Sequence, residues 1–144
     1  VSGLKAELQK ILGLDREWPV ALVGFGNLGL ALFHYKGFAR QGFRIAVVVD
    51  DDPAKVGRDV DHVPIVASRD LAREIRPHGI QIAIVAVPAE SAQVVTDQLV
   101  AAGIRAVLNF APMRLKVPRD VRLKNVDLSI ELETLSFYLA KSSR

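Results

Sequence analysis

Residues 18–29, with the sequence WPVALVGFGNLG, join a short apolar run to a glycine-rich turn. The run Trp18–Val23 has the composition of a buried β-strand, and a helical pattern of apolar residues continues over Leu28–Phe38. A strand that passes through a turn directly into a helix is the opening half of a βαβ unit. This stretch therefore predicts the first strand and helix of a parallel sheet.

The turn itself has the pattern G-x-G-x-x-G, which binds the pyrophosphate of a dinucleotide when it lies between a strand and a helix. Gly24 permits the tight turn, Gly26 lets the backbone approach the phosphates, and Gly29 lets the helix pack closely on the sheet. The following helix contributes unpaired N–H groups and the positive end of its dipole. The predicted pyrophosphate loop consists of Gly24, Phe25, Gly26, Asn27, Leu28 and Gly29.

An acidic residue at the end of the second strand supports the same prediction. The apolar run Phe43–Val49 leads directly to Asp50, which lies 21 positions after the last glycine of the motif. A carboxylate there accepts hydrogen bonds from the adenosine ribose and repels the 2′-phosphate of NADP. Asp51 increases the negative potential, while Asp52-Pro53 predicts the start of a helix.

The rest of the chain continues the alternation of strands and helices. Further strands are predicted at Val63–Ala67, Ile80–Val87, Ile104–Phe110 and Val121–Val126, with helices at Arg69–Arg76 (capped by Ser68), Pro88–Ala102 (closed by Gly103) and about Asp127 to Lys141. This order predicts an α/β fold, a Rossmann-type parallel sheet with helices on both faces. We expect one nucleotide-binding domain over residues 18–126, preceded by a linker helix in residues 1–17 and followed by a dimerisation helix in residues 127–144.

Ligands of open parallel sheets bind outside the carboxyl ends of the strands. Two segments at this edge are apolar and contain small residues, which suits an uncharged dihydronicotinamide ring. They are Val87 and Pro88 after one strand, and Asn109, Phe110, Ala111 and Pro112 after the next.

Composition excludes several other kinds of site. The 144 residues carry a formal net charge of +3 and no cysteine, so disulfides, thiolate metal sites and cysteine nucleophiles are excluded. No metal-ligand cluster is visible, and the longest apolar runs are too short to span a bilayer. Without a signal-peptide pattern, a cytoplasmic location is expected.

The catalytic residues of a dehydrogenase are not apparent in the sequence. His34, His62 and His78 do not fall at the carboxyl end of any predicted strand. Tyr35 is followed four positions later by Ala39, so the Tyr-x-x-x-Lys pair of short-chain dehydrogenases is missing there. We therefore expect a protein that binds a dinucleotide without turning it over.

The last predicted helix is apolar on more than one side. Leu128, Leu132, Leu135 and Leu139 are spaced like a coiled-coil seam, and further apolar residues lie off that seam. One small sheet can cover only one side of such a helix. We expect the helix to be swapped between the two subunits of a homodimer.

Several segments together resemble the Rex family of redox-sensing transcriptional repressors. The residues that carry the resemblance are Ile11–Leu14, Val23–Gly29, Asp50–Gly57, Val87–Ala89, Ala102–Ile104, Leu108–Pro112, Val117-Pro118 and Val126–Leu128. They are spread over the whole chain, and the combination is far more specific than the glycine motif alone.

The resemblance implies a winged-helix DNA-binding domain that this chain does not contain, with Leu4–Leu12 as the connecting helix. It implies a homodimer that binds NADH and NAD⁺, leaves operator DNA when NADH binds, and contacts that DNA only through the winged helix. It also implies a cofactor contact at Tyr35 and a swapped helix that begins at Asp127 and Leu128. Asp51, Lys55 and Val56, in the segment after the second strand, are further predicted cofactor residues. Specific operator binding by this chain alone is not expected.

Two other classes of protein share the early motif. One is the nucleotide-binding domain of an NAD-dependent dehydrogenase, whose catalytic residues would lie elsewhere. The other is a CoA-binding domain, for which basic residues facing the 3′-phosphate would be expected in place of Asp50. Neither explains the terminal helix joined to the Asn109–Pro112 segment.

Overall fold

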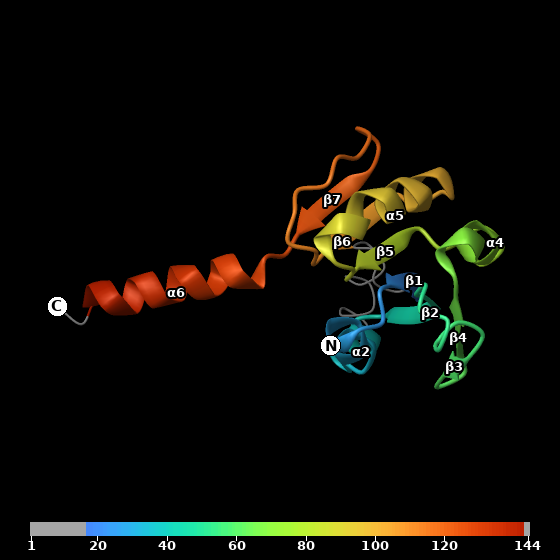
Figure 1. The fold of residues 1–144 in the computed structure, drawn as a ribbon, viewed down its shortest axis with the longest axis horizontal. Helices are drawn as coiled ribbons and strands as arrows, with labels where there is room; N and C mark the ends of the chain where they lie inside the picture. The colour runs from blue at the N-terminus through green and yellow to red at the C-terminus, as the bar shows by residue number, and fades with distance from the viewer. Residues whose placement is uncertain (1–16, 143–144) are drawn as a thin grey trace, which may run out of the picture.

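A seven-stranded sheet forms the centre of the computed structural model, which describes residues 17–142 (Figure 1). The strand order is β3-β4-β2-β1-β5-β6-β7, and every pair is parallel except the hairpin of β3 and β4. The strands are β1 (Trp18–Val23), β2 (Phe43–Val49), β3 (Asp59–Val60), β4 (Val63–Val66), β5 (Ile82–Val85), β6 (Ala106–Asn109) and β7 (Arg122–Asn125). The predicted Rossmann-type parallel sheet is confirmed.

Helices pack against both faces of this sheet, because the side chains of each strand alternate between two apolar cores. Ala21 and Val23 of β1 join the core that includes α4 (Leu71–Ile75) and α5 (Ala89–Ala101). Val20 and Leu22 join the opposite core, which includes Phe25 and residues of α2 (Asn27–Phe33) and α3 (Gly37–Arg40). The central strands are thus buried on both sides.

The register of the sheet brings the carboxyl ends of its strands to one edge. Val23 at the end of β1 pairs with Val49 of β2 and with Val85 of β5. Val85 in turn pairs with Asn109 at the end of β6. The residues that follow these strands therefore emerge side by side.

Helix α5 ends at the position that Gly103 predicts. Gly103 has φ +110°, its N–H donates to Val100 O, and the N–H of Ile104 donates to Leu99 O. This pair of bonds is a Schellman motif, which needs a left-handed residue after the last helical turn. It returns the chain directly toward β6.

The predicted helix Leu28–Phe38 is wrong in its length, since the chain breaks it after Phe33 and starts α3 at Gly37. In the turn between them the ring of Tyr35 lies over Gly37, where an added Cβ would come within 2.3 Å of it. The same ring packs edge-on against Phe38, with centroids 4.9 Å apart. This local aromatic packing replaces the last turn of a single long helix.

Two smaller predictions also need correction, and one strand was not predicted. Ser68 does not cap a helix with its side chain but begins a 3₁₀ turn, Ser68–Asp70, because its hydroxyl donates to Asp51. Asp52-Pro53 begins a turn and not a helix, with the N–H of Ala54 donating to Asp52 Oδ1. The hairpin strand β3 was missed; its turn uses Asp61 and His62 at positive φ.

Helix α6 (Leu128–Ser142) stretches away from the rest of the molecule (Figure 1). Leu132, Leu135, Phe137, Tyr138 and Leu139 are all strongly exposed. None of the described helices is long and apolar enough to cross a membrane. The linker helix expected at Leu4–Leu12 lies outside the described residues.

Asn109 organises the exit from β6. Its side chain is fully buried, and its amide nitrogen donates to Ala111 O, Met113 O and Asn125 Oδ1 at 3.0–3.2 Å. Its Oδ1 accepts the N–H of Ala111 at 2.9 Å. Because the amide has two N–H groups for three acceptors, one N–H is shared, and the side chain shapes the loop and ties β6 to β7.

We predict that Asn109→Ala lowers the free energy of unfolding by about 2–3 kcal/mol, because it leaves buried backbone groups unpaired. Urea denaturation followed by circular dichroism measures the change. The exposed Gln41→Ala is the control, and its change is expected to stay within about 0.5 kcal/mol. An equal loss in both variants would contradict this role of Asn109.

Candidate functional site

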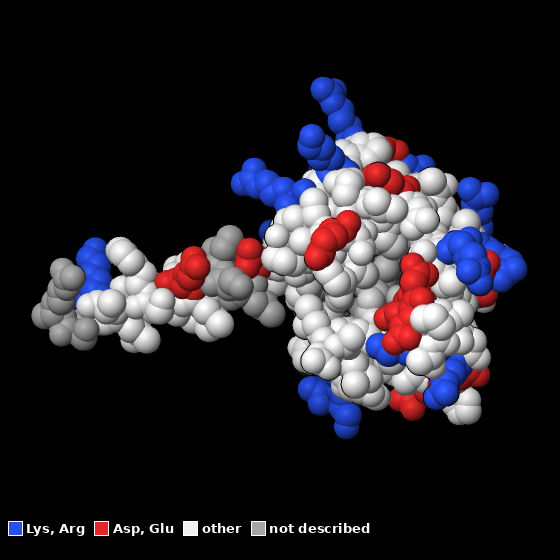
Figure 2. Space-filling view, viewed as in Figure 1, with Lys and Arg blue, Asp and Glu red and all other residues white. Residues whose placement is uncertain are grey.

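A pocket of about 780 Å³ opens at the edge where β1, β2, β5 and β6 end. Figure 2 shows the hollow with acidic side chains at its rim. It lies between the glycine loop, the turn after β2, the first turns of α5 and the segment after β6. Its lining residues are Val23, Gly24, Phe25, Gly26, Asn27, Leu28, Val49, Asp50, Asp51, Asp52, Lys55, Ser68, Ala86, Val87, Pro88, Glu90, Ser91, Val94, Val95, Gln98, Phe110 and Pro112.

The three motif glycines differ in the reason each is needed. Gly24 has φ +103°, and a Cβ there would lie 2.5 Å from Ala86 O. A Cβ at Gly29 would lie 1.9 Å from Gly24 O, so α2 packs on the turn without room for a side chain. A Cβ at Gly26 would meet nothing within 4 Å, so this residue leaves its backbone open to the pocket.

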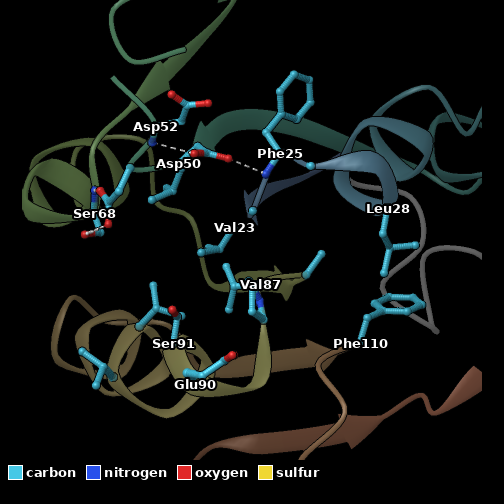
Figure 3. A pocket seen from close by; sticks show the side chains of 18 of the residues that line it. Val23, Phe25, Leu28, Asp50, Asp52, Ser68, Val87, Glu90, Ser91 and Phe110 are labelled. Atoms are coloured by element: carbon cyan, nitrogen blue, oxygen red, sulfur yellow. Dashed lines mark hydrogen bonds between the residues drawn. The ribbon is translucent and has the colours of Figure 1, made fainter. Parts of the chain in front are cut away.

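Asp50 and Lys55 hold the peptide groups on either side of Phe25. The N–H of Phe25 donates to Asp50 Oδ2 at 2.8 Å, and Lys55 Nζ donates to Phe25 O at 2.8 Å. Asp50 Oδ1 also accepts the N–H of Asp52 at 2.8 Å; Figure 3 draws both Asp50 bonds. Each carboxylate oxygen keeps a further lone pair, so Asp50 can anchor the glycine loop and still accept a ligand hydroxyl.

Asp51 anchors a different segment. Its Oδ1 accepts the N–H of Ser68 at 2.7 Å, and its Oδ2 accepts the Ser68 hydroxyl at 2.8 Å. This double contact fastens the turn after β2 to the start of the 3₁₀ turn after β4. One end of the pocket is therefore polar and acidic, built from Asp50, Asp51, Asp52 and Ser68.

The other end of the pocket is apolar. Leu28 from α2 and Phe110 after β6 point toward one another there (Figure 3). Pro88 and Pro112 contribute further apolar surface, and Glu90 enters from the first turn of α5. The pocket thus offers hydrogen-bond acceptors at one end and an apolar surface at the other.

The charges in the pocket are mainly negative. Asp50, Asp51, Asp52 and Glu90 face one cation, Lys55, which is already bonded to Phe25 O and lies 3.9 Å from Asp52. No histidine or tyrosine is among the described lining residues, and no described group of three His, Asp or Glu could hold a metal ion. The described charged residues of the lining therefore carry a net negative charge.

Most of the predicted cofactor residues line this pocket. Those that do are Gly24, Phe25, Gly26, Asn27, Leu28, Asp50, Asp51, Lys55, Val87, Pro88, Phe110 and Pro112. Those that do not are Gly29, Tyr35, Val56, Asn109 and Ala111. Gly29, Asn109 and Ala111 are buried beneath the segments that line the pocket. Tyr35 lines a separate hollow with Phe33 and Phe38.

Among the polar lining residues, sequence reasoning missed Ser68, Glu90, Ser91 and Gln98, and it assigned Asp52 only to the start of a helix. A signal for the first three existed, because Ser68 follows the end of β4, and Glu90 and Ser91 lie in the first turn after β5. The rule that ligands bind at the carboxyl ends of strands would have found them. Gln98 enters from the third turn of α5, which only the packing of that helix brings to the pocket.

Comparison with known protein families and structures gives a consistent result. Residues 15–113 match the family described as CoA binding domain. The chain is 46% identical over 138 residues to the redox-sensing transcriptional repressor Rex of Streptomyces coelicolor, and 47% identical over 144 residues to that of Syntrophomonas wolfei. The two alignments cover 96% and 100% of this chain, and 54% and 69% of those relatives. The chain thus spans about half the length of the Streptomyces relative.

Solved structures of similar fold include a Rex-family repressor called RSP. RSP in complex with beta-NADH is 38% identical, with a TM-score of 0.87 over 99% of this chain and 69% of RSP. RSP with beta-NAD⁺ and operator DNA gives a TM-score of 0.90 over 99% of this chain and 65% of RSP. More distant dehydrogenases, such as WlbA from Chromobactrium violaceum at 21% identity and a TM-score of 0.59, share the fold alone.

We predict that Lys55→Met accelerates hydrogen exchange of the glycine-loop amides from Phe25 to Leu28, because Phe25 O loses its side-chain donor. Hydrogen exchange resolved by NMR measures the effect. Lys36→Met removes a similar charge from an exposed site in the turn before α3 and should leave these amides unchanged. Equal exchange in wild type and Lys55→Met would show that the bond does not restrain the loop.

Proposed function

Because this chain belongs to the Rex family of redox-sensing transcriptional repressors, we propose that its pocket binds NADH and NAD⁺ and serves as the cofactor sensor of such a repressor. NADH binding would release the full-length protein from operator DNA in the cytoplasm. The observation that carries this proposal is the Asp50 carboxylate at the acidic end of the pocket, beside a glycine loop whose backbone is open at Gly26.

The shape of the pocket supports one orientation of the dinucleotide. The adenosine ribose would lie at Asp50, and the pyrophosphate would cross the backbone at Gly26. The nicotinamide would then reach Leu28, Phe110 and Pro88. An uncharged dihydronicotinamide loses less hydration than the cationic ring of NAD⁺ when it enters an apolar site, which favours the reduced form.

The family match to CoA-binding domains makes CoA the alternative ligand. CoA carries a 3′-phosphate on its ribose, and the ribose end of this pocket presents Asp50, Asp51 and Asp52. Two unit charges 4 Å apart repel by about 4 kcal/mol at a surface-like dielectric. The same repulsion acts on the 2′-phosphate of NADP, so both ligands are disfavoured relative to NAD(H).

We predict tight binding of NADH, weaker binding of NAD⁺, and little binding of NADPH or CoA. Isothermal titration calorimetry with each ligand measures this order. Asp50→Ala should weaken NADH binding by about 1–3 kcal/mol through the loss of charge-assisted hydrogen bonds. Asp59→Ala, at an exposed acid in β3, is the matched control. Equal affinity for NADPH and NADH would overturn the ribose assignment.

We also propose that the chain forms a homodimer in which α6 packs against the partner subunit. Leu132, Leu135 and Leu139 follow one side of the helix, and Phe137 and Tyr138 lie off that side. Burying such residues in a two-fold symmetric dimer removes their apolar surface from water and leaves no unpaired patch. Asp127 and Leu128, at the start of this helix, are the proposed switch residues, with Leu132, Leu135 and Leu139 as the contact.

Light scattering is expected to give the mass of a dimer at micromolar concentration. Deletion of residues 128–144 should give a monomeric or insoluble product, because the helix that joins the subunits is removed. Leu132→Ser combined with Leu135→Ser keeps the chain length and should weaken the dimer in the same direction. A stable monomer of the intact chain would refute the swapped helix, as would a dimer that persists after the deletion.

No dehydrogenase turnover is predicted, because no histidine or tyrosine of the described residues lines the pocket to act on a substrate. NADH absorbance in the presence of small ketones and 2-oxo acids measures turnover. The decay should match a buffer blank. Steady oxidation that disappears in Gly26→Asp would show that the pocket catalyses hydride transfer.

A further inference from the structure

Positive charge is concentrated in residues 105–126, which form β6, β7 and the loop between them. Six Lys and Arg against one Asp give this segment a net charge of +5, whereas the whole chain carries +3. The rest of the chain is therefore net negative. The cations are Arg105, Arg114, Lys116, Arg119, Arg122 and Lys124, called the basic face below, and all six are exposed.

The basic face is held in a defined shape by the apolar residues between its cations. Leu115 and Val121 are buried, and Val117 and Leu123 pack against the same core as α5. Each inward side chain anchors the backbone and turns its charged neighbours outward. Figure 2 shows Lys and Arg side chains projecting from the molecule over β7 and the loop before it.

Gln93 of α5 adds a second restraint on this loop. Its Nε2 donates to Lys116 O at 2.9 Å, and its Oε1 accepts the N–H of Lys116 at 2.9 Å. A side-chain amide that pairs with both groups of one residue acts like a neighbouring strand. The loop that carries Arg114, Lys116 and Arg119 is thus fastened to a long helix.

The cations of the basic face are largely uncompensated. Arg105 pairs with Asp120, but within residues 17–142 no ion pair is formed by Arg114, Lys116, Arg119, Arg122 or Lys124. Such a field of like charge is repulsive by itself and attracts a polyanion. Charges on an edge strand such as β7 can also serve only to prevent strand pairing between molecules.

Whereas the family resemblance implies that only the winged helix contacts DNA, we propose that the basic face binds the sugar-phosphate backbone of double-stranded DNA, independently of sequence, as a second contact of the repressor. The inference rests on the proposed function, since it takes the DNA to be the partner of the full-length protein. The basic face consists of a loop and an edge strand, with no helix to enter a groove, so phosphates rather than base edges are its ligands.

The test measures binding of this chain to a short random-sequence duplex by fluorescence anisotropy at 50 and 200 mM salt. Each neutralised phosphate contributes about −0.9 to the slope of log K against log salt, so three contacts predict about a 40-fold loss of affinity over this range. The variant Arg119→Gln/Arg122→Gln/Lys124→Gln should abolish most of that dependence. The control Arg40→Gln/Arg69→Gln/Arg73→Gln changes the net charge equally, at exposed sites outside the basic face.

Wild-type binding that is lost in the first variant and retained in the control supports the proposal. Absence of binding at 50 mM salt, equal loss in both variants, or tighter binding to poly-glutamate than to the duplex would overturn it. Aggregation of the first variant with unchanged DNA affinity would show that the charges prevent strand pairing at β7 and do not bind DNA. Calorimetry with NADH separates the two claims, because normal NADH binding without DNA binding rejects the basic face and leaves the proposed function intact.

Discussion

The backbone at Phe25 is held from both sides, and the geometry of the pocket depends on that restraint. Asp50 accepts its N–H and Lys55 donates to its carbonyl oxygen, each at 2.8 Å. These bonds add to the backbone bonds from Gly24 to Val49 and from Leu30 to Gly26, and they restrain a segment whose glycines would otherwise allow many conformations. A turn between β2 and β3 therefore helps to set the shape of a loop between β1 and α2.

The acidic residues of the pocket have structural as well as chemical roles. Asp50 accepts a hydrogen bond from the glycine loop at Phe25, and Asp51 accepts one from Ser68 at the start of the 3₁₀ turn. Asp52 accepts the N–H of Ala54 within its own turn. In the proposed binding mode, the same carboxylates disfavour ligands with an additional phosphate on the ribose. Stability of the loops and selection of the ligand are consequently linked through the same side chains.

The apolar end of the pocket is connected to the far end of the chain by a short path. Phe110 and Pro112 line the pocket, and the loop that carries them is shaped by the buried amide of Asn109. That amide also donates to Asn125, the last residue of β7, and α6 begins shortly after it. The outward residues of β7 carry charge, while its Leu123 packs on the core. The edge of the sheet formed by β6 and β7 thus carries the loop that lines the pocket, the connection to α6 and the basic face.

Local sequence was sufficient for six of the seven strands, the glycine turn and Asp50. A strand is recognised from its run of apolar residues, a tight turn from its glycines, and the acidic residue from its place after a strand. None of these patterns requires knowledge of residues distant in sequence. Most of the predicted cofactor residues consequently reach the pocket. Tyr35 was assigned by resemblance, and in this structure it packs against Phe38 outside the pocket.

Contacts between residues distant in sequence could not be predicted in this way. The bond of Lys55 to Phe25, the pairing of Asp51 with Ser68 and the clamp of Gln93 on Lys116 join residues 17–30 positions apart. The break after Phe33 depends on an aromatic ring that lies over a glycine. The periodicity of apolar residues predicts which helices and strands form, because it shows which side of each segment is buried. The shape of the pocket and the direction of its polar groups came from the packing of those segments, because a hydrogen bond between distant residues leaves no periodic trace in the chain.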